Sequence, residues 1–138
     1  PTNNRSELVK TGSNTLIVDA YNANPTSMAA ALDSFGQIAT QLPKMAILGD
    51  MRELGEVSEA EHQTVVDTLK AKGLNDVWLV GEEFGKTRCD FHKYNNVEEV
   101  KQAIASYKPC GKCLLPCGKC ILIKGSNGTK LFELPELL

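Results

Sequence analysis

The sequence has no long hydrophobic run, since its longest uninterrupted apolar stretch covers only residues 28–32. A transmembrane helix needs about 20 apolar residues, so we expect no membrane partner. The chain also lacks an excess of basic charge, because 15 Lys and Arg residues face 17 Asp and Glu residues and the net charge is -2. Nothing in this balance attracts a phosphate backbone, so nucleic acid is not an expected partner.

Two glycine-rich phosphate motifs are missing as well. The sequence contains neither a G-x-x-x-x-G-K-[ST] run nor a G-x-G-x-x-G run, the motifs that bind triphosphates and dinucleotides. The chain by itself therefore has no recognisable triphosphate-binding loop. We expect it to hold a substrate or to complete the site of a partner domain.

The first ten residues are polar and include neither an initiator Met nor an apolar signal core. This start is typical of a cut made inside a longer protein. We expect residues 1–13 to be the remnant of an interdomain linker and residues 14–138 to form a single domain. The length of 138 residues and the 42% hydrophobic content fit one globular domain of ordinary size.

Four short runs, residues 15–19, 44–48, 76–80 and 120–124, are apolar on consecutive residues. Such runs predict strands that are covered on both faces. Helical spacing lies between them: from a cap at Thr26 to Leu42, from an S-x-x-E capping box at Ser58 to Gly73, and from Asn96 towards Pro109. The alternation predicts an α/β fold, with a Rossmann-like, mostly parallel sheet, helices on both faces and a single domain.

In open parallel sheets, ligands bind beyond the carboxyl ends of the strands, so the loops after the apolar runs are the candidate site. The first of these loops contains Asp19, Tyr21, Asn22 and Asn24 directly before a helix. Their carboxylate, phenol and carboxamides suit recognition of a base edge, a hydroxyl or a peptide group. The competing interpretation is that the Asx residues only form turns and caps.

The loop after the second run carries Asp50, Arg52 and Glu53. The two carboxylates suit an ammonium group, whereas we expect Arg52 to form a surface ion pair in a solvated loop. His62 lies on the apolar side of its helix and is either a packing residue or a ligand contact.

The last of these loops places Lys124 and Ser126 directly after the fourth apolar run, among two glycines. A cation and a hydroxyl beside flexible backbone suit the binding of a carboxylate or a phosphate.

Two C-x-x-C units, Cys110 with Cys113 and Cys117 with Cys120, are separated by three residues. Four thiolates suit zinc or an iron-sulfur cluster, which gives a four-cysteine metal-binding or redox module as an alternative function. Three intervening residues that include Pro116 leave little room to arrange four sulfurs around one centre. We therefore favour a local duplication that lengthens a surface loop.

Three motifs occur in a fixed order: D-A-Y-N-A-N-P-T-S-M from residue 19, G-D-M-R-E-L-G-E-V-S-E-A-E-H from residue 49 and I-K-G-S from residue 123. Together they make the chain similar to the C-terminal domain of the Mur ligase family, from about residue 4 to residue 134. The resemblance is to the branch that adds D-alanyl-D-alanine to a UDP-N-acetylmuramoyl-tripeptide. It implies a cytoplasmic bacterial enzyme of peptidoglycan synthesis.

The resemblance implies an ATP-dependent, amide-forming ligase of three domains. ATP phosphorylates the terminal carboxylate of the nucleotide-linked peptide, and the amine of the dipeptide then attacks the acyl phosphate. ATP and Mg²⁺ would be bound mainly by the central domain, which this sequence lacks, so we expect no catalytic residue and no turnover in the chain alone. Its partners would be its own N-terminal and central domains, which close on it.

The resemblance also implies roles for the residues of the loops. Asp19, Tyr21, Asn22 and Asn24 would face the nucleotide and the domain interface, Asp50, Glu53 and His62 would line the crevice for the dipeptide, and Lys124 and Ser126 would lie near its carboxylate. One departure stands out: relatives commonly have Arg at the position of Asn127, so a bidentate donor is missing there. A third hypothesis is an α/β binding module without catalysis.

Overall fold

The computed structural model describes residues 7–11, 14–20, 22–107 and 118–138. These residues form one sheet with the strand order β1-β2-β6-β3-β4-β5. The strands are β1 (Glu7–Lys10), β2 (Thr15–Asp19), β3 (Lys44–Gly49), β4 (Val77–Val80), β5 (His92–Tyr94) and β6 (Cys120–Lys124). All neighbours are parallel except β1, which runs antiparallel to β2. The predicted α/β class with a mostly parallel sheet is confirmed.

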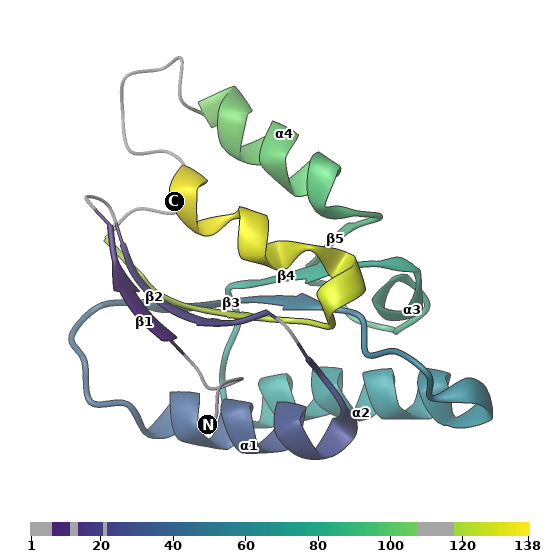
Figure 1. Cartoon of the computed structure of the whole chain (residues 1–138). Helices are drawn as coiled ribbons and strands as arrows, with labels where there is room; N and C mark the ends of the chain where they lie inside the picture. Colours follow the sequence, from purple (N-terminus) through teal and green to yellow (C-terminus); the bar gives the residue numbers. More distant parts are fainter. Residues whose placement is uncertain (1–6, 12–13, 21, 108–117) are drawn as a thin grey trace.

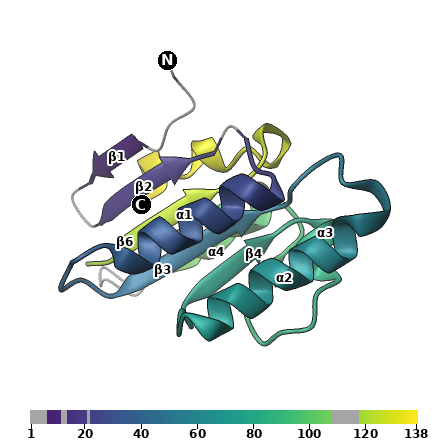
Figure 2. The same cartoon turned by 90° about the horizontal axis from the view of Figure 1, so that it is seen from below.

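Helices cover both faces of the sheet, as predicted. The helices α1 (Pro25–Gln37) and α2 (Ser58–Ala71) lie on one face, and α4 (Val97–Tyr107) lies on the other together with the C-terminal 3-10 turns (Figure 1). The view from below shows α1 and α2 side by side over this face of the sheet (Figure 2). The short helix α3 (Glu82–Gly85) follows β4 directly.

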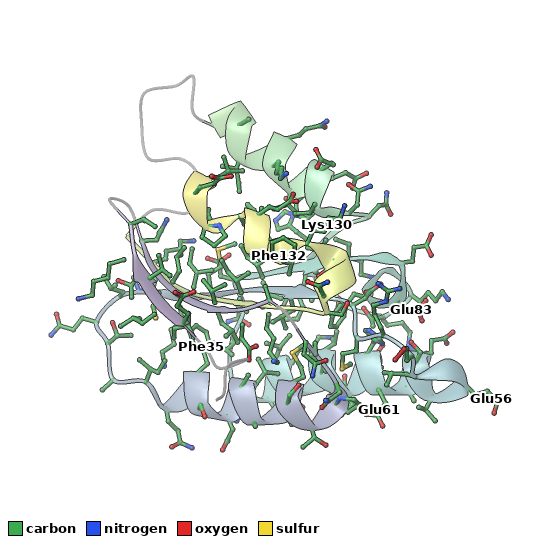
Figure 3. The ribbon with its side chains drawn as sticks, viewed as in Figure 1. Phe35, Glu56, Glu61, Glu83, Lys130 and Phe132 are labelled. Atoms are coloured by element: carbon green, nitrogen blue, oxygen red, sulfur yellow. The ribbon has the colours of Figure 1, made fainter. Side chains whose placement is uncertain are left out.

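Alternate residues of each strand point to opposite faces, so the sheet separates two apolar cores. Leu48, Leu79 and Leu122 pack towards α1 and α2, where Phe35 lies between α1 and the sheet (Figure 3). Ile47, Val80 and Ile123 pack on the other side. Because both faces are covered, the strands need apolar residues at consecutive positions.

Two local expectations require correction. The helix α1 ends at Gln37, because Ile38 is extended (φ -62, ψ 125), so the apolar spacing that continues to Leu42 lies outside the helix. Ser58 does not cap α2, since the N-cap is Val57 and has no side-chain hydrogen bond. The Ser58 hydroxyl instead donates to Glu83 Oε1 at 2.6 Å, 25 residues away in the sequence.

The segment expected to be a linker remnant contributes to the sheet. Residues 7–10 form the edge strand β1, which pairs with β2 from Glu7 opposite Val18 to Lys10 opposite Thr15. The sheet therefore includes four residues that precede residue 14, where we expected the domain to begin. None of the helices in the described part of the chain combines the length and the apolarity needed to cross a membrane.

A candidate ligand site at the carboxyl ends of the strands

Three of the predicted loops meet at one edge of the sheet. Lys124, the last residue of β6, is paired in register with Asp19 of β2 and with Leu48 of β3. The backbone N–H of Ser126 donates to the carbonyl of Asp50 at 3.2 Å, which joins the loop after β6 to the loop after β3. The carboxyl-end rule therefore gathers these loops as expected.

Lys124 is held in the interior of this edge. The residue is 1% exposed, and its Nζ donates to Asp19 Oδ2 at 2.8 Å and to the carbonyl of Asn22 at 3.1 Å. A buried ammonium group needs such partners to compensate for its lost hydration. The ion pair fixes the loop after β2 against the end of β6.

The structure assigns a capping role to one residue of the first loop, and the recognition role of the loop stays a prediction. Asn24, and not Thr26, caps α1: Asn24 Oδ1 accepts from the N–H of Ser27 at 2.8 Å, and Ser27 Oγ accepts from the N–H of Asn24 at 3.0 Å. Turn and cap chemistry therefore accounts for Asn24. The side chain of Asn22 is exposed. Tyr21 lies outside the described residues.

A cavity of about 800 Å³ opens at the same edge of the sheet, between the loops that follow β3, β4, β5 and β6. Of the predicted dipeptide-binding residues, Asp50, Glu53 and Ser126 line it, whereas His62 and Lys124 lie outside its wall. The charged side chains of the wall are Asp50, Arg52, Glu53, Glu82, Glu83, Glu98 and Lys130. The cavity therefore offers both signs of charge to a ligand.

Asp50 organises one wall of the cavity. Its Oδ2 accepts from the backbone N–H of Glu83 and its Oδ1 from that of Phe84, both at 2.9 Å, so it caps α3. Burial raises the pKa of the Asp50 carboxyl above its ordinary value, although these two hydrogen bonds oppose the effect. The carboxylate lies so close to Gly81 that a β-carbon there would meet Asp50 Cγ at 2.3 Å.

His62 is a fully buried residue behind this wall. Its Nε2 accepts from the backbone N–H of Met51 at 3.0 Å, which puts the proton on Nδ1, and Nδ1 donates to the carbonyl of Ser58 at 2.7 Å. The ring also packs edge-to-face on Phe84, with 4.7 Å between the centroids. Both ring nitrogens are engaged, so His62 positions the loop after β3 and presents no free nitrogen to a ligand.

Glu53 has a left-handed backbone, with φ of 62. This conformation costs a residue with a β-carbon on the order of 1 kcal/mol, and such outliers concentrate at functional sites. The side chain of Glu53 is exposed at the mouth of the cavity.

The hydroxyl of Ser126 is the feature of the cavity that its own chain leaves unsatisfied. Ser126 is 5% exposed, and among the described residues its Oγ is the one buried side-chain nitrogen or oxygen without a hydrogen-bond partner. Burying a hydroxyl without a partner costs about 1–3 kcal/mol. A ligand atom in the cavity would remove this cost.

Several wall residues were not predicted. Glu82 and Glu83 follow β4, Asn95 follows β5, and Lys130 lies in the C-terminal segment. Lys130 and Glu83 come to the same end of the molecule from different elements (Figure 3). The carboxyl-end rule also points to the segments after β4 and β5, so their positions were the signal that could have found Glu82, Glu83 and Asn95.

The structure gives the four-cysteine alternative no support. Cys110, Cys113 and Cys117 lie outside the described residues. Cys120 is buried at the start of β6, in the core under α1 and α2, and burial raises the pKa of its thiol. In the described ranges, no group of three or more His, Cys, Asp and Glu side chains is arranged to hold a metal ion.

Glu83 predicts a pH dependence of stability. The hydrogen bond from Ser58 and the contact with Lys86 lower the pKa of Glu83 below its ordinary value of 4.5. The folded state therefore favours the carboxylate, and the stabilisation is present above pH 4.5 and lost as the pH falls through the folded pKa. We expect Glu83→Gln to reduce the loss of stability between pH 6 and pH 3, measured by urea unfolding at each pH. An unchanged pH profile would contradict this assignment, and Glu59→Gln, at an exposed position, is the matched control.

The fold and the cavity define an α/β domain with a candidate ligand site at the carboxyl ends of its strands, and its sequence contains no phosphate loop. Residues 4–127 match the family described as Mur ligase, glutamate ligase domain. The chain therefore belongs to the Mur ligase family.

Two named relatives and two solved structures show which branch of the family the chain is similar to. It is 32% identical to the UDP-N-acetylmuramoyl-tripeptide–D-alanyl-D-alanine ligase of Bacillus subtilis, over 94% of this chain and 29% of that protein. The enzyme of the same name from Rickettsia prowazekii is also 32% identical, over 94% of this chain and 28% of that protein. The chain thus spans about three-tenths of the length of these relatives.

A crystal structure of MurF from Acinetobacter baumannii superposes with a TM-score of 0.78 at 26% identity, covering 97% of this chain and 29% of that one. MurF ligase from Thermotoga maritima, solved in complex with ADP, gives a TM-score of 0.76 over 99% of this chain and 30% of that one. At 19% identity, the second likeness shows the fold alone.

Proposed function

We propose that this chain is the C-terminal domain of an ATP-dependent ligase and supplies the half of the active site that binds D-alanyl-D-alanine. The relatives from Bacillus subtilis and Rickettsia prowazekii carry the name of this activity. The observation that carries the proposal is the cavity of about 800 Å³ at the carboxyl edge, with charges of both signs in its wall. Small-molecule sites have volumes of roughly 300–1,000 Å³.

The charges of the cavity fit a zwitterion. D-alanyl-D-alanine has an ammonium group at one end and a carboxylate at the other, separated by one peptide group. Glu82 and Glu98 offer carboxylates from the first turns of α3 and α4, whereas Arg52 and Lys130 offer cations from the segments that follow β3 and β6. Opposite charges at the two ends of a site fix the orientation of such a ligand.

Phosphoryl transfer is assigned to the rest of the enzyme. The sequence has no triphosphate loop, and Mg²⁺ is usually bound together with the phosphates of its nucleotide. ATP and Mg²⁺ therefore belong mainly to the central domain in this proposal. Asp19, Asn22 and Asn24 would lie at the interface with that domain, where the exposed carboxamide of Asn22 is available to the nucleotide.

In the assembled enzyme, this domain would orient the dipeptide so that its amine attacks the acyl phosphate of the nucleotide-linked peptide. The new bond joins the amine nitrogen to the acyl carbon, phosphate leaves, and the amine loses a proton. Closure of the domains brings the two halves together and excludes water from the acyl phosphate. The enzyme would act in the bacterial cytoplasm, where peptidoglycan precursors are assembled.

A chimera tests this proposal. The Bacillus subtilis relative is expressed with its corresponding part replaced by residues 1–138, and amide formation is followed with ATP, UDP-N-acetylmuramoyl-tripeptide and D-alanyl-D-alanine. We expect ATP-dependent product from the chimera, and none from the chain alone or from the recipient lacking this part. A folded chimera that binds ATP and forms no product would contradict the proposal.

A further inference from the structure

Arg52 extends into the cavity wall from the loop after β3. Its guanidinium forms no ion pair and no hydrogen bond with any described residue, contrary to the surface ion pair that we expected from the sequence. The side chain extends over Gly128 instead, where an added β-carbon would lie 1.8 Å from Nη1 and 2.9 Å from Cζ. The missing side chain at position 128 thus makes room for the guanidinium in the cavity wall.

The guanidinium therefore lies close to the turn that begins at Ser126. Gly128 belongs to the 3-10 turn Asn127–Thr129, and Ser126 is the N-cap of this turn without a side-chain cap hydrogen bond. The buried Ser126 hydroxyl, which has no described partner, and Arg52 line the same cavity. Two donors without acceptors are thus brought to one wall by the ends of β3 and β6.

We propose that Arg52 and Ser126 form an anion subsite that binds the terminal carboxylate of D-alanyl-D-alanine. This assignment rests on the proposed function. A guanidinium binds a carboxylate through two parallel N–H donors, and the hydroxyl supplies a third donor. Lys130, on the same wall, adds positive charge.

The subsite also sets the direction of the dipeptide. With its carboxylate at the end of β6, the ammonium group points towards the carboxylates of Glu82 and Glu98, which lie after β4 and β5. A ligand placed in the opposite direction would bring its carboxylate to these like charges, which costs affinity. Arg52 is in this account a specificity-determining residue.

Calorimetric titration of the chain with two ligands tests the subsite. D-alanyl-D-alanine has the carboxylate, and D-alanyl-D-alanine amide lacks its negative charge. Loss of a charge-assisted hydrogen bond lowers affinity on the order of tenfold or more, so we expect the amide to bind that much more weakly. Arg52→Gln should weaken dipeptide binding by a similar factor and leave amide binding unchanged.

Further variants test the arrangement independently. Ser126→Ala removes the hydroxyl, and Gly128→Ala displaces the guanidinium without removing it, so both should weaken dipeptide binding selectively. Arg88→Gln, at an exposed arginine outside the cavity, is the matched control and should bind both ligands normally. Arg52 is exposed and has no partner among the described residues. Its replacement should therefore leave the fold intact, which the backbone amide NMR spectrum of the variant checks.

The outcomes separate this inference from the proposed function. Equal affinity for dipeptide and amide, or undiminished dipeptide binding by Arg52→Gln, overturns the subsite and leaves the proposed function standing. A second titration, with acetate, is followed by the NMR shift of the Ser126 backbone amide. If the dipeptide does not bind, and acetate shifts this amide in the unaltered chain but not in Arg52→Gln, the anion subsite is supported and the proposed function is refuted. Absence of binding by dipeptide and acetate overturns both.

Discussion

Gly81→Ala is expected to lower the free energy of unfolding by about 3 kcal/mol or more, because two costs add. Gly81 has φ of 122 and ψ of 165, a region that is essentially restricted to glycine. The new β-carbon would also lie 2.3 Å from Oδ2 of Asp50. The carboxylate would have to move and release the backbone N–H groups of Glu83 and Phe84. Urea unfolding of both proteins measures the difference.

Gly85→Ala is the matched control, because Gly85 is the last residue of α3 and Gly81 is the N-cap residue of the same helix. A β-carbon at Gly85 meets nothing within 4 Å, and the position has no positive φ. We expect its free energy of unfolding to stay within about 0.5 kcal/mol of the unaltered chain. Equal stability of the two variants would mean that Asp50 does not hold the α3 turn as described.

Lys124→Met is expected to destabilise the chain by about 3 kcal/mol, since removal of one partner of a buried pair leaves the other charge uncompensated. The side chains of Lys124 and Asp19 are 2% and 14% exposed, so water only partly replaces the lost cation. Thermal or urea unfolding gives the magnitude. The double variant Asp19→Asn/Lys124→Met should lose less stability than the sum of the losses in the two single variants.

The control for this ion pair is Lys72→Met. Lys72 pairs with Asp33 at 3.1 Å on the surface, where the side chains are 29% and 64% exposed. Exposed pairs contribute about 0–1 kcal/mol. A loss at Lys124 as small as that at Lys72, or strict additivity in the double variant, would show that the buried pair does not anchor the loop after β2.

The strands were the most predictable part of the fold. Two predicted strands, residues 15–19 and 120–124, agree with β2 and β6 residue for residue, because burial on both faces requires consecutive apolar residues. Helix ends were less predictable. Ser58 has the sequence of a capping box, yet its hydroxyl bonds to Glu83, a partner that only the tertiary structure brings near.

The location of the candidate site followed from topology, but the direction of its side chains did not. Asp50, Glu53 and Ser126 line the cavity, and their contact with a dipeptide stays a prediction. Lys124, at the end of β6, and His62, in α2, instead turn inward to Asp19 and to Met51. Partners 105 and 11 residues away decide these directions, and the sequence alone shows no such pairing.

The most direct test of the account is to locate D-alanyl-D-alanine on the folded chain by backbone amide shifts in an NMR titration. We predict that the shifts concentrate at residues 50–55 and 126–130, two segments that contribute to the wall of the cavity. L-alanyl-L-alanine serves as the stereochemical control and should shift these amides less. Saturable shifts confined to α1 and β1, or none in the two predicted segments, would contradict the claim that this cavity binds the dipeptide.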